Sequence, residues 1–254
     1  MTSLVLDRPI RLVTFDLYDT LVEARPPRWE RFVIASTRTG LSANAMQFRA
    51  ADRVAEDFYT RENAKTPIRD REPEEREAFR LAYTATMLEA AGLPHDPITV
   101  QAVRDIYRGE LDAIGWNYRV FDDVSPALEA LRDAGIQRAV ISNADADVTA
   151  FCLHMGFAQQ MDLIVTSALV GWEKPDARTY FAALDPLGVR PEDALHIGDQ
   201  ALSDVAGARV IGMSAALIDR YDRHRDDEHD AIRVGSLADL AAMVIEHNRQ
   251  YAER

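Results

Sequence analysis

Polar side chains follow four short apolar runs of the sequence, at the point where each run ends. Two runs end in an aspartate, one ends in a serine–asparagine pair, and one is followed by a lysine. Each group alone is ordinary, because aspartate and serine commonly form turns or cap helices after a strand. If the runs are parallel strands of one sheet, their carboxyl ends meet at one edge and these side chains converge. The residues are Asp16, Ser142, Asn143, Lys174, Asp199 and, five positions beyond Asp199, Asp204.

Together these residue types suit the transfer of a phosphoryl group. Asp16 and Asp199 supply hard oxygen ligands for Mg²⁺, which prefers few carboxylates, several waters and a substrate phosphate. Lys174 would offset the repulsion between the carboxylates and lower the pKa of a nucleophilic aspartate. The Ser142 hydroxyl and its neighbouring amides can donate hydrogen bonds to phosphoryl oxygens. Asp16 would attack in line and form an aspartyl-phosphate, which water then hydrolyses.

The elements that must position these residues form an alternating pattern. The apolar runs are continuous and rich in β-branched residues, as strands covered on both faces require. Amphipathic helical patterns separate the runs, and this alternation predicts βαβ units and a parallel sheet. We therefore expect an α/β fold whose core is a Rossmann-like parallel sheet. The predicted strands are residues 10–15, 138–141, 162–165, 194–197 and 215–218.

The interval between the first and second predicted strands shows a different sequence pattern. It holds long helical patterns and no convincing strand, so we predict that residues 23–118 form an inserted helical cap. The sheet core then consists of residues 1–22 and 119–254. Hinges are expected near residues 24–27 and 115–121. The helical patterns of the cap lie at 28–39, 45–61, 74–91 and 98–111.

Charge and composition exclude several classes of protein. The chain of 254 residues carries 42 acidic and 29 basic side chains, a net charge of −13, whereas a nucleic-acid surface needs clustered cations. Its single cysteine, Cys152, excludes a disulfide framework and a cysteine zinc site. The sequence shows neither an apolar run of bilayer length nor a signal-peptide pattern. We expect a soluble, cytoplasmic protein with a small phosphorylated substrate and no nucleic-acid or membrane partner; its oligomeric state stays open.

The most densely charged stretch of the chain covers residues 222–230. It reads Asp-Arg-His-Arg-Asp-Asp-Glu-His-Asp, and its two histidines would suit a metal ion. Runs of charge, however, usually face water. We therefore predict that this stretch is a solvated loop between two strands.

The order of the four motifs resembles the haloacid dehalogenase superfamily, whose hydrolases use an aspartyl nucleophile on a Rossmann-like core. The matching stretches are FDLYDTL, VISNAD, GWEKPDARTY and HIGDQALSDVAGARVIGM. The last stretch and TSALVGWEKPD look especially similar to the group of haloacid dehalogenase-like hydrolase domain-containing protein three. The helical insert is similar to the family's type-one cap. The resemblance covers residues 10–21 and 121–220.

The resemblance implies a magnesium site and a set of catalytic residues. Asp16 would be both the nucleophile and a metal ligand, with the backbone carbonyl of Tyr18 as a second ligand. Asp199 matches the acidic residue that binds the metal directly. Asp204 matches the aspartate that supports the metal's ligands or reaches the metal through a water molecule. The other matching residues are Thr20, which orients the nucleophile, Ser142 and Asn143, which bind phosphate, and Lys174, which balances charge and contacts phosphate.

The match breaks at Tyr18, where phosphatases of the family carry an aspartate that protonates the leaving oxygen. A phenol with a pKa near 10 is a poorer proton shuttle at neutral pH than a tuned carboxyl group. Three explanations stay open. The leaving group needs little protonation, as in an acyl phosphate; another group supplies the proton; or the protein is a weak or inactive enzyme that serves as a binding module. The candidate donors are Glu23, His95 and Asp122.

Tyrosine at this position is also what the family's 2-haloacid dehalogenases show. In that reaction Asp16 would displace halide from carbon without a metal, and an arginine of the cap would hold the halide. Arg38, Arg49 and Arg53 are candidates for this role. The resemblance implies, however, that dehalogenases replace the acidic metal ligand with neutral residues, whereas this chain keeps Asp199. We therefore favour phosphoryl transfer.

Overall fold

A computed structural model describes residues 8–114, 117–224 and 231–254. The chain divides into two compact units, one of Met1–Glu23 with Val120–Arg254 and one of Ala24–Arg119. Two parts of the sequence predictions, residues 115–116 of the second hinge and residues 225–230 of the charged stretch, lie outside the described residues. In the described ranges, no helix combines the length and apolar character needed to cross a membrane.

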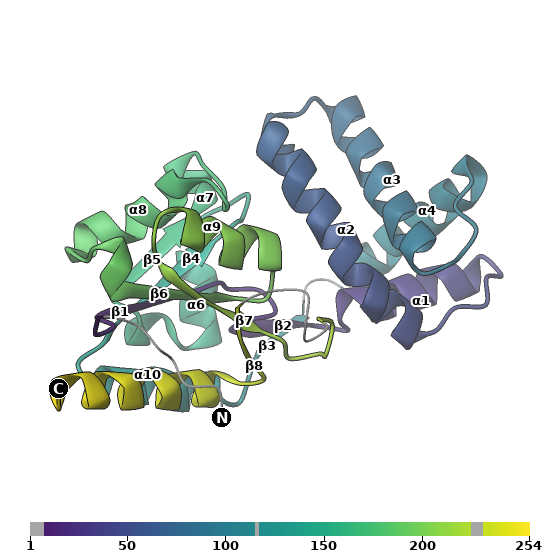
Figure 1. Ribbon diagram of the computed structural model, residues 1–254. Helices are drawn as coiled ribbons and strands as arrows, with labels where there is room; N and C mark the ends of the chain where they lie inside the picture. The colour runs from purple at the N-terminus through teal and green to yellow at the C-terminus, as the bar shows by residue number, and fades with distance from the viewer. Residues whose placement is uncertain (1–7, 115–116, 225–230) are drawn as a thin grey trace. The chain divides into compact units, whose positions relative to one another are not determined.

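The first unit is built on a six-stranded sheet with the order β5-β4-β1-β6-β7-β8, in which every neighbouring pair is parallel (Figure 1). After β1 the chain adds β4 and β5 on one side, and then β6, β7 and β8 on the other. The winding therefore reverses next to β1, and ligands of open parallel sheets bind at such a switch point. The strands are β1 (Leu12–Phe15), β4 (Gln137–Ser142), β5 (Leu163–Thr166), β6 (Ala194–Gly198), β7 (Ser214–Ile218) and β8 (Ile232–Val234).

The α/β fold with a parallel sheet is confirmed, and all five predicted strands are present. The prediction missed β8, a strand of three residues that follows the charged stretch and is only partly buried. Such a short run carries too few apolar side chains to show a periodic pattern.

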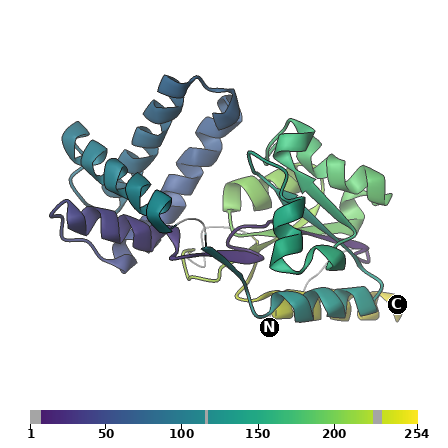
Figure 2. The same cartoon turned by 180° about the vertical axis from the view of Figure 1, so that it is seen from behind.

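Helices cover both faces of this sheet. Successive side chains of a strand point to opposite faces, and those of the central strand β1 are all fully buried. Helix α10 (Leu237–Ala252) lies along α5 (Val124–Asp133) on one face, as both views show (Figures 1 and 2). On the other face, α8 (Ala177–Leu187) and α9 (Gly207–Val210) pack against the strands.

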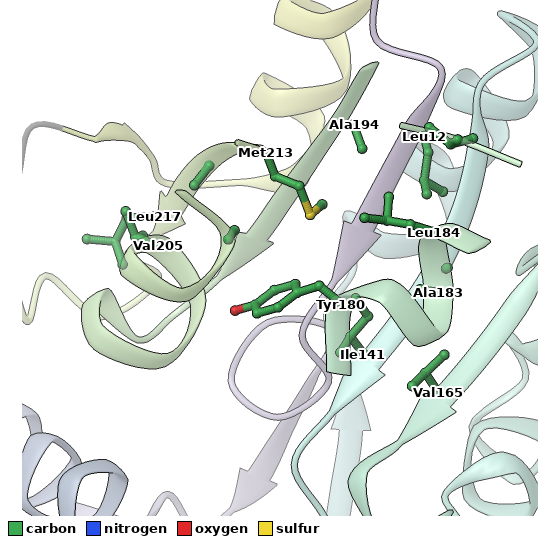
Figure 3. Close-up of a cluster of buried hydrophobic side chains, with 14 residues drawn as sticks. Leu12, Ile141, Val165, Tyr180, Ala183, Leu184, Ala194, Val205, Met213 and Leu217 are labelled. Carbon is green, nitrogen blue, oxygen red and sulfur yellow. The ribbon is translucent and has the colours of Figure 1, made fainter. Parts of the chain in front are cut away.

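The second face contains a well-packed hydrophobic core (Figure 3). Tyr180 and Leu184 of α8 contribute large side chains, and Leu12 and Ile141 come from the neighbouring strands β1 and β4. All four are fully buried. Burial of four such side chains, at about 1.5–3 kcal/mol each, fixes the strands whose ends carry the predicted site.

In its described residues, the second unit is built mainly of four α-helices, with a short 3-10 helix at Ile68–Asp70 between two of them. Helix α2 packs along α3, and α1 packs against α4. All four helices were predicted from their apolar periodicity. They are α1 (Arg28–Arg38), α2 (Ala45–Lys65), α3 (Pro73–Ala90) and α4 (Pro97–Ile114).

The chain passes between the two units through a two-stranded sheet of β2 (Val22–Arg25) and β3 (Asn117–Val120). The expectation of no strand between residues 23 and 118 is therefore wrong at both ends of that interval. Each strand has four residues, and each ends in or contains an arginine, so neither forms an apolar run that a pattern search would find.

Candidate active site

Asp16 lies directly after β1, at the switch point of the sheet. Its backbone N–H donates to the carbonyl of Ile197 in β6, at 2.8 Å. The chain then turns sharply, because the N–H groups of Leu21 and Val22 both donate to the carbonyl of Leu17, at 2.9 and 3.0 Å. This turn holds the predicted nucleophile at the carboxyl edge of the sheet.

Arg220, which follows β7, fixes the same turn although it lies 200 residues from Thr20 in the sequence. Its guanidinium donates two hydrogen bonds to the carbonyl of Thr20, at 3.0 and 2.8 Å, and also binds the carboxylate of Asp123. The guanidinium lies over the ring of Phe121 at 3.8 Å. Sequence reasoning did not find Arg220, because nothing in its local sequence distinguishes it from the chain's other arginines.

Lys174 joins two of the predicted carboxylates. Its Nζ lies 2.7 Å from Asp16 Oδ1 and 2.7 Å from Asp204 Oδ1. The side chains of Lys174 and Asp204 are each 1% exposed, whereas that of Asp16 is 13% exposed. Asp16 is therefore the member of this group that a substrate can reach.

Asn143 positions the lysine. Its Oδ1 accepts the backbone N–H of Lys174 at 2.8 Å, and its Nδ2 donates to the backbone carbonyl of the same residue at 2.9 Å. The side-chain amide is thus used at both ends to hold the lysine loop. These contacts do not support the predicted phosphate-binding role of this side chain.

Asp204 is held on both oxygens. Its Oδ1 accepts from Lys174 and lies 3.3 Å from Nε2 of His196, and its Oδ2 accepts the backbone N–H of Gln200 at 2.9 Å. The other ring nitrogen of His196 lies 2.8 Å from the Thr14 hydroxyl. Burial raises the pKa of Asp204, but Lys174 and His196 outweigh it and hold this pKa below its usual range. With its oxygens committed in this way, Asp204 suits a supporting role better than a direct metal ligand.

Gly198 leaves the space that the Asp204 carboxylate occupies. A Cβ added at Gly198 would overlap that carboxyl group. Gly198→Ala is therefore expected to displace the carboxylate and lower the free energy of unfolding by about 1–3 kcal/mol, measured by urea denaturation. Gly109→Ala is the matched control in α4, because nothing lies within 4 Å of its added Cβ. The control should be neutral or stabilised by up to about 1 kcal/mol, and equal stability of the two variants would contradict the packing argument.

Asp199 follows β6 and is paired with an arginine that was not predicted. Its Oδ2 accepts from Nη2 of Arg223 at 2.6 Å, and Nη1 of the same guanidinium lies 4.0 Å from Oδ2 of Asp19. Nε2 of His224 lies 3.1 Å from the backbone carbonyl of Asp199. Burial raises the pKa of Asp199 well above its usual range, although Arg223 opposes this shift.

The prediction of a solvated loop is wrong for Arg223 and His224, which are only 7% and 5% exposed. The carboxylate of Asp219 accepts the backbone N–H groups of both residues, at 2.8 and 3.0 Å, and folds them back over the end of β6. The only local signal was the aspartate placed four residues before the arginine, a spacing that allows a side chain to cap a turn.

Two hydroxyl groups at the site are buried without a partner. Ser142 and Thr20 are fully buried, and neither Ser142 Oγ nor Thr20 Oγ1 makes a hydrogen bond within the described part of the chain. An unsatisfied buried hydroxyl costs about 1–3 kcal/mol, so these groups are suited to meet an acceptor brought by a ligand. The observation fits the predicted phosphate contact of Ser142, which stays a prediction.

Tyr18 lies beside Asp16 in the turn, with its ring 6.0 Å from that of Phe151. Burial and the charge of Asp16 raise the pKa of Tyr18 to about 12. The phenol therefore stays protonated at neutral pH and is a weak acid. It is poorly suited to protonate a leaving group.

The other proposed donors and halide ligands are spread over both units. Glu23 is buried in the first unit, where it accepts from the hydroxyl of Tyr221 at 3.4 Å, and Asp122 is exposed shortly after β3. The remaining candidates, which belong to the second unit, are His95, Arg38, Arg49 and Arg53.

The donor set fits a magnesium ion. Asp16 and Asp199 follow neighbouring strands, and the described residues contain no group of three or more His, Cys, Asp or Glu that could hold a metal. Mg²⁺ needs no such cage, because it binds through one or two carboxylates with water and a phosphate. Burial raises the pKa of Asp16 to about 6, against the effect of Lys174. A divalent cation would stabilise the ionised form of buried carboxylates whose pKa is raised.

Comparisons with known proteins show which family the chain resembles. A family model described as haloacid dehalogenase-like hydrolase matches residues 10–212. Human haloacid dehalogenase-like hydrolase domain-containing protein 3 is 28% identical over 213 residues, which are 82% of each chain. Phosphoserine phosphatase of Thermus thermophilus is 34% identical over 125 residues, 48% of this chain and 50% of the relative. The crystal structure of a 2-haloacid dehalogenase from Pseudomonas syringae superposes with a TM-score of 0.55 and 26% identity, covering 94% of this chain and 99% of that one.

Proposed function

The chain belongs to the haloacid dehalogenase-like hydrolases, and within this family we propose that it is a magnesium-dependent phosphatase of a small phosphorylated metabolite. The observation that carries the proposal is the retained carboxylate pair, Asp16 and Asp199, on neighbouring strands of the switch point. A buried anionic pair would repel the anionic substrate of a metal-free dehalogenase, whereas a divalent cation turns the same pair into a phosphate site. The named phosphatases among its relatives support this choice.

Asp16 acts as the nucleophile in this proposal. Lys174 holds its Oδ1 and leaves Oδ2 to attack phosphorus, so a P–O bond to Asp16 forms as the bond to the leaving oxygen breaks. Water then attacks the phosphorus of the aspartyl-phosphate, releases inorganic phosphate and restores the carboxylate. Ser142 donates its unpartnered hydroxyl to the phosphoryl group. When bound by Asp16, Asp199 and the carbonyl of Tyr18, Mg²⁺ would neutralise negative charge on the nucleophile and the phosphate.

Tyr18 favours substrates whose leaving groups are stable anions. A phenol of pKa about 12 gives little help to an alkoxide, but an acyl or aryl phosphate departs without a proton. We therefore expect higher kcat/KM for acetyl phosphate and p-nitrophenyl phosphate than for glycerol phosphate.

A metal-independent 2-haloacid dehalogenase is the second candidate. Tyr18 and the 26% identical dehalogenase structure favour it. Asp16 would then attack the carbon that carries the halogen, release halide and form an ester, which water hydrolyses.

Release of phosphate and of halide separates the candidates. The protein is incubated with acetyl phosphate, p-nitrophenyl phosphate or 2-chloropropionate, each with Mg²⁺ or with EDTA. The phosphatase predicts phosphate release that requires Mg²⁺. Chloride release in EDTA would instead establish the dehalogenase. Absence of turnover across a broad panel of both substrate types would leave the binding module.

A further inference from the structure

The pair of Arg223 and Asp199 places a permanent cation on a proposed metal ligand. The contact is made through one oxygen: Nη2 of Arg223 lies 2.6 Å from Oδ2 of Asp199. The two side chains are 3% and 4% exposed, so the contact is shielded from water. A guanidinium keeps its charge at any pH at which a protein is folded, and the pair therefore persists wherever Asp199 is ionised.

The arginine is held in place by its own backbone. Asp219 accepts the N–H groups of Arg223 and His224, and Arg233 in turn donates to the same carboxylate at 2.7 Å. His224 adds a contact to the backbone carbonyl of Asp199. Because the segment is fixed at several points, the guanidinium points at Oδ2 of Asp199. Hydrogen-bond partners of this kind orient the side chains that bind metals.

We propose that Arg223 is a specificity-determining residue of the metal site, which keeps Oδ2 of Asp199 occupied and thereby selects Mg²⁺ against Ca²⁺. The inference rests on the proposed function, because it assumes that Asp199 is a metal ligand. With one oxygen engaged by Arg223, Asp199 offers a cation only the other oxygen. Mg²⁺ requires single-oxygen carboxylate ligands in a tight octahedron, whereas Ca²⁺ gains from carboxylates that bind through both oxygens.

The net charge of the site also favours Mg²⁺ over Ca²⁺. Among the described residues, the ion pairs of the site join four carboxylates, those of Asp16, Asp19, Asp199 and Asp204, to two cations, Lys174 and Arg223. If all are ionised, the carboxylates exceed the cations by two, which one divalent ion balances. Loss of Arg223 would add a third negative charge and a free oxygen, both of which favour a larger, more highly coordinated ion.

Isothermal titration calorimetry of Mg²⁺ and Ca²⁺ binding tests the inference without use of activity. We expect the wild-type chain to bind Mg²⁺ more tightly than Ca²⁺. In Arg223→Gln the ratio of the two dissociation constants, Ca²⁺ over Mg²⁺, should fall by about tenfold, mainly because Ca²⁺ binds more tightly. Arg178→Gln is the matched control, since it removes the same charge from an exposed guanidinium that binds Asp176. The control should leave the ratio unchanged.

A crystal structure of the wild-type chain with Mg²⁺ supplies a second measurement that does not depend on the folding of a variant. We expect Asp199 to bind the ion through one oxygen while the other still accepts from Arg223. An Asp199 that binds through both oxygens, or an Arg223 that has left it, would overturn the inference. So would an unchanged affinity ratio in Arg223→Gln, or an equal change in Arg178→Gln. If the wild type binds neither ion, the magnesium part of the proposed function fails together with the inference.

Discussion

Asp16→Asn is expected to lower kcat/KM for acetyl phosphate on the order of 10⁴-fold or more, because an amide cannot attack phosphorus. The amide oxygen can still accept the hydrogen bond from Lys174, which lies 2.7 Å from Asp16 Oδ1, so the fold should be retained. Phosphate release at saturating Mg²⁺ measures the effect, and circular dichroism confirms folding.

Asp133→Asn is the matched control for this substitution. Asp133 lies at the end of α5 with 70% of its side chain exposed, so the same change there should leave the rate within about twofold. Equal rates for Asp16→Asn and Asp133→Asn would rule out Asp16 as the nucleophile, and with it the aspartyl-phosphate.

Lys174→Met is expected to lower the free energy of unfolding by about 3–5 kcal/mol at neutral pH, because it leaves two buried carboxylates without their common cation. Urea denaturation measures this loss. Lys174 holds the pKa of Asp204 below the unfolded value, so this stabilisation is present at neutral pH and is lost as the pH falls toward that lowered pKa. The difference between variant and wild type should therefore shrink in acid.

The same variant should change the pH dependence of activity. Burial raises the pKa of Asp16 and Lys174 lowers it, with a resulting value of about 6. Without Lys174 the pKa rises further, so the acidic limb of kcat/KM against pH should move upward by at least about one unit. An unmoved limb would show that Lys174 does not control the ionisation of the nucleophile.

Lys65→Met is the matched control for Lys174→Met. The sequence contains only two lysines, Lys65 and Lys174, and all its other basic side chains are arginines. Lys65 lies at the end of α2, 68% exposed, and pairs with Glu62. Its replacement should change stability by less than about 0.5 kcal/mol. A loss equal to that of Lys174→Met would mean that burial of the charge is not the cause.

The sequence by itself determined the architecture of the sheet core and the candidate reacting groups. Short continuous apolar runs rich in β-branched residues suit strands covered on both faces, and these runs predicted the five strands and hence the sheet. Asp16 and Asp199 were found because each stands directly at the end of such a run. These signals are local: the residue types within a few positions carry the information.

Tertiary structure alone decided which side chains support the reacting groups. Arg223 approaches Asp199 across 24 residues of chain, and Arg220 approaches Thr20 across 200; neither arginine was predicted. A charged side chain is stable in the interior only where the fold brings it an opposite charge. The sequence of residues 222–224 therefore looks the same whether these side chains face water or a buried carboxylate. Only the return of the segment over β6, held by Asp219, makes Arg223 part of the site.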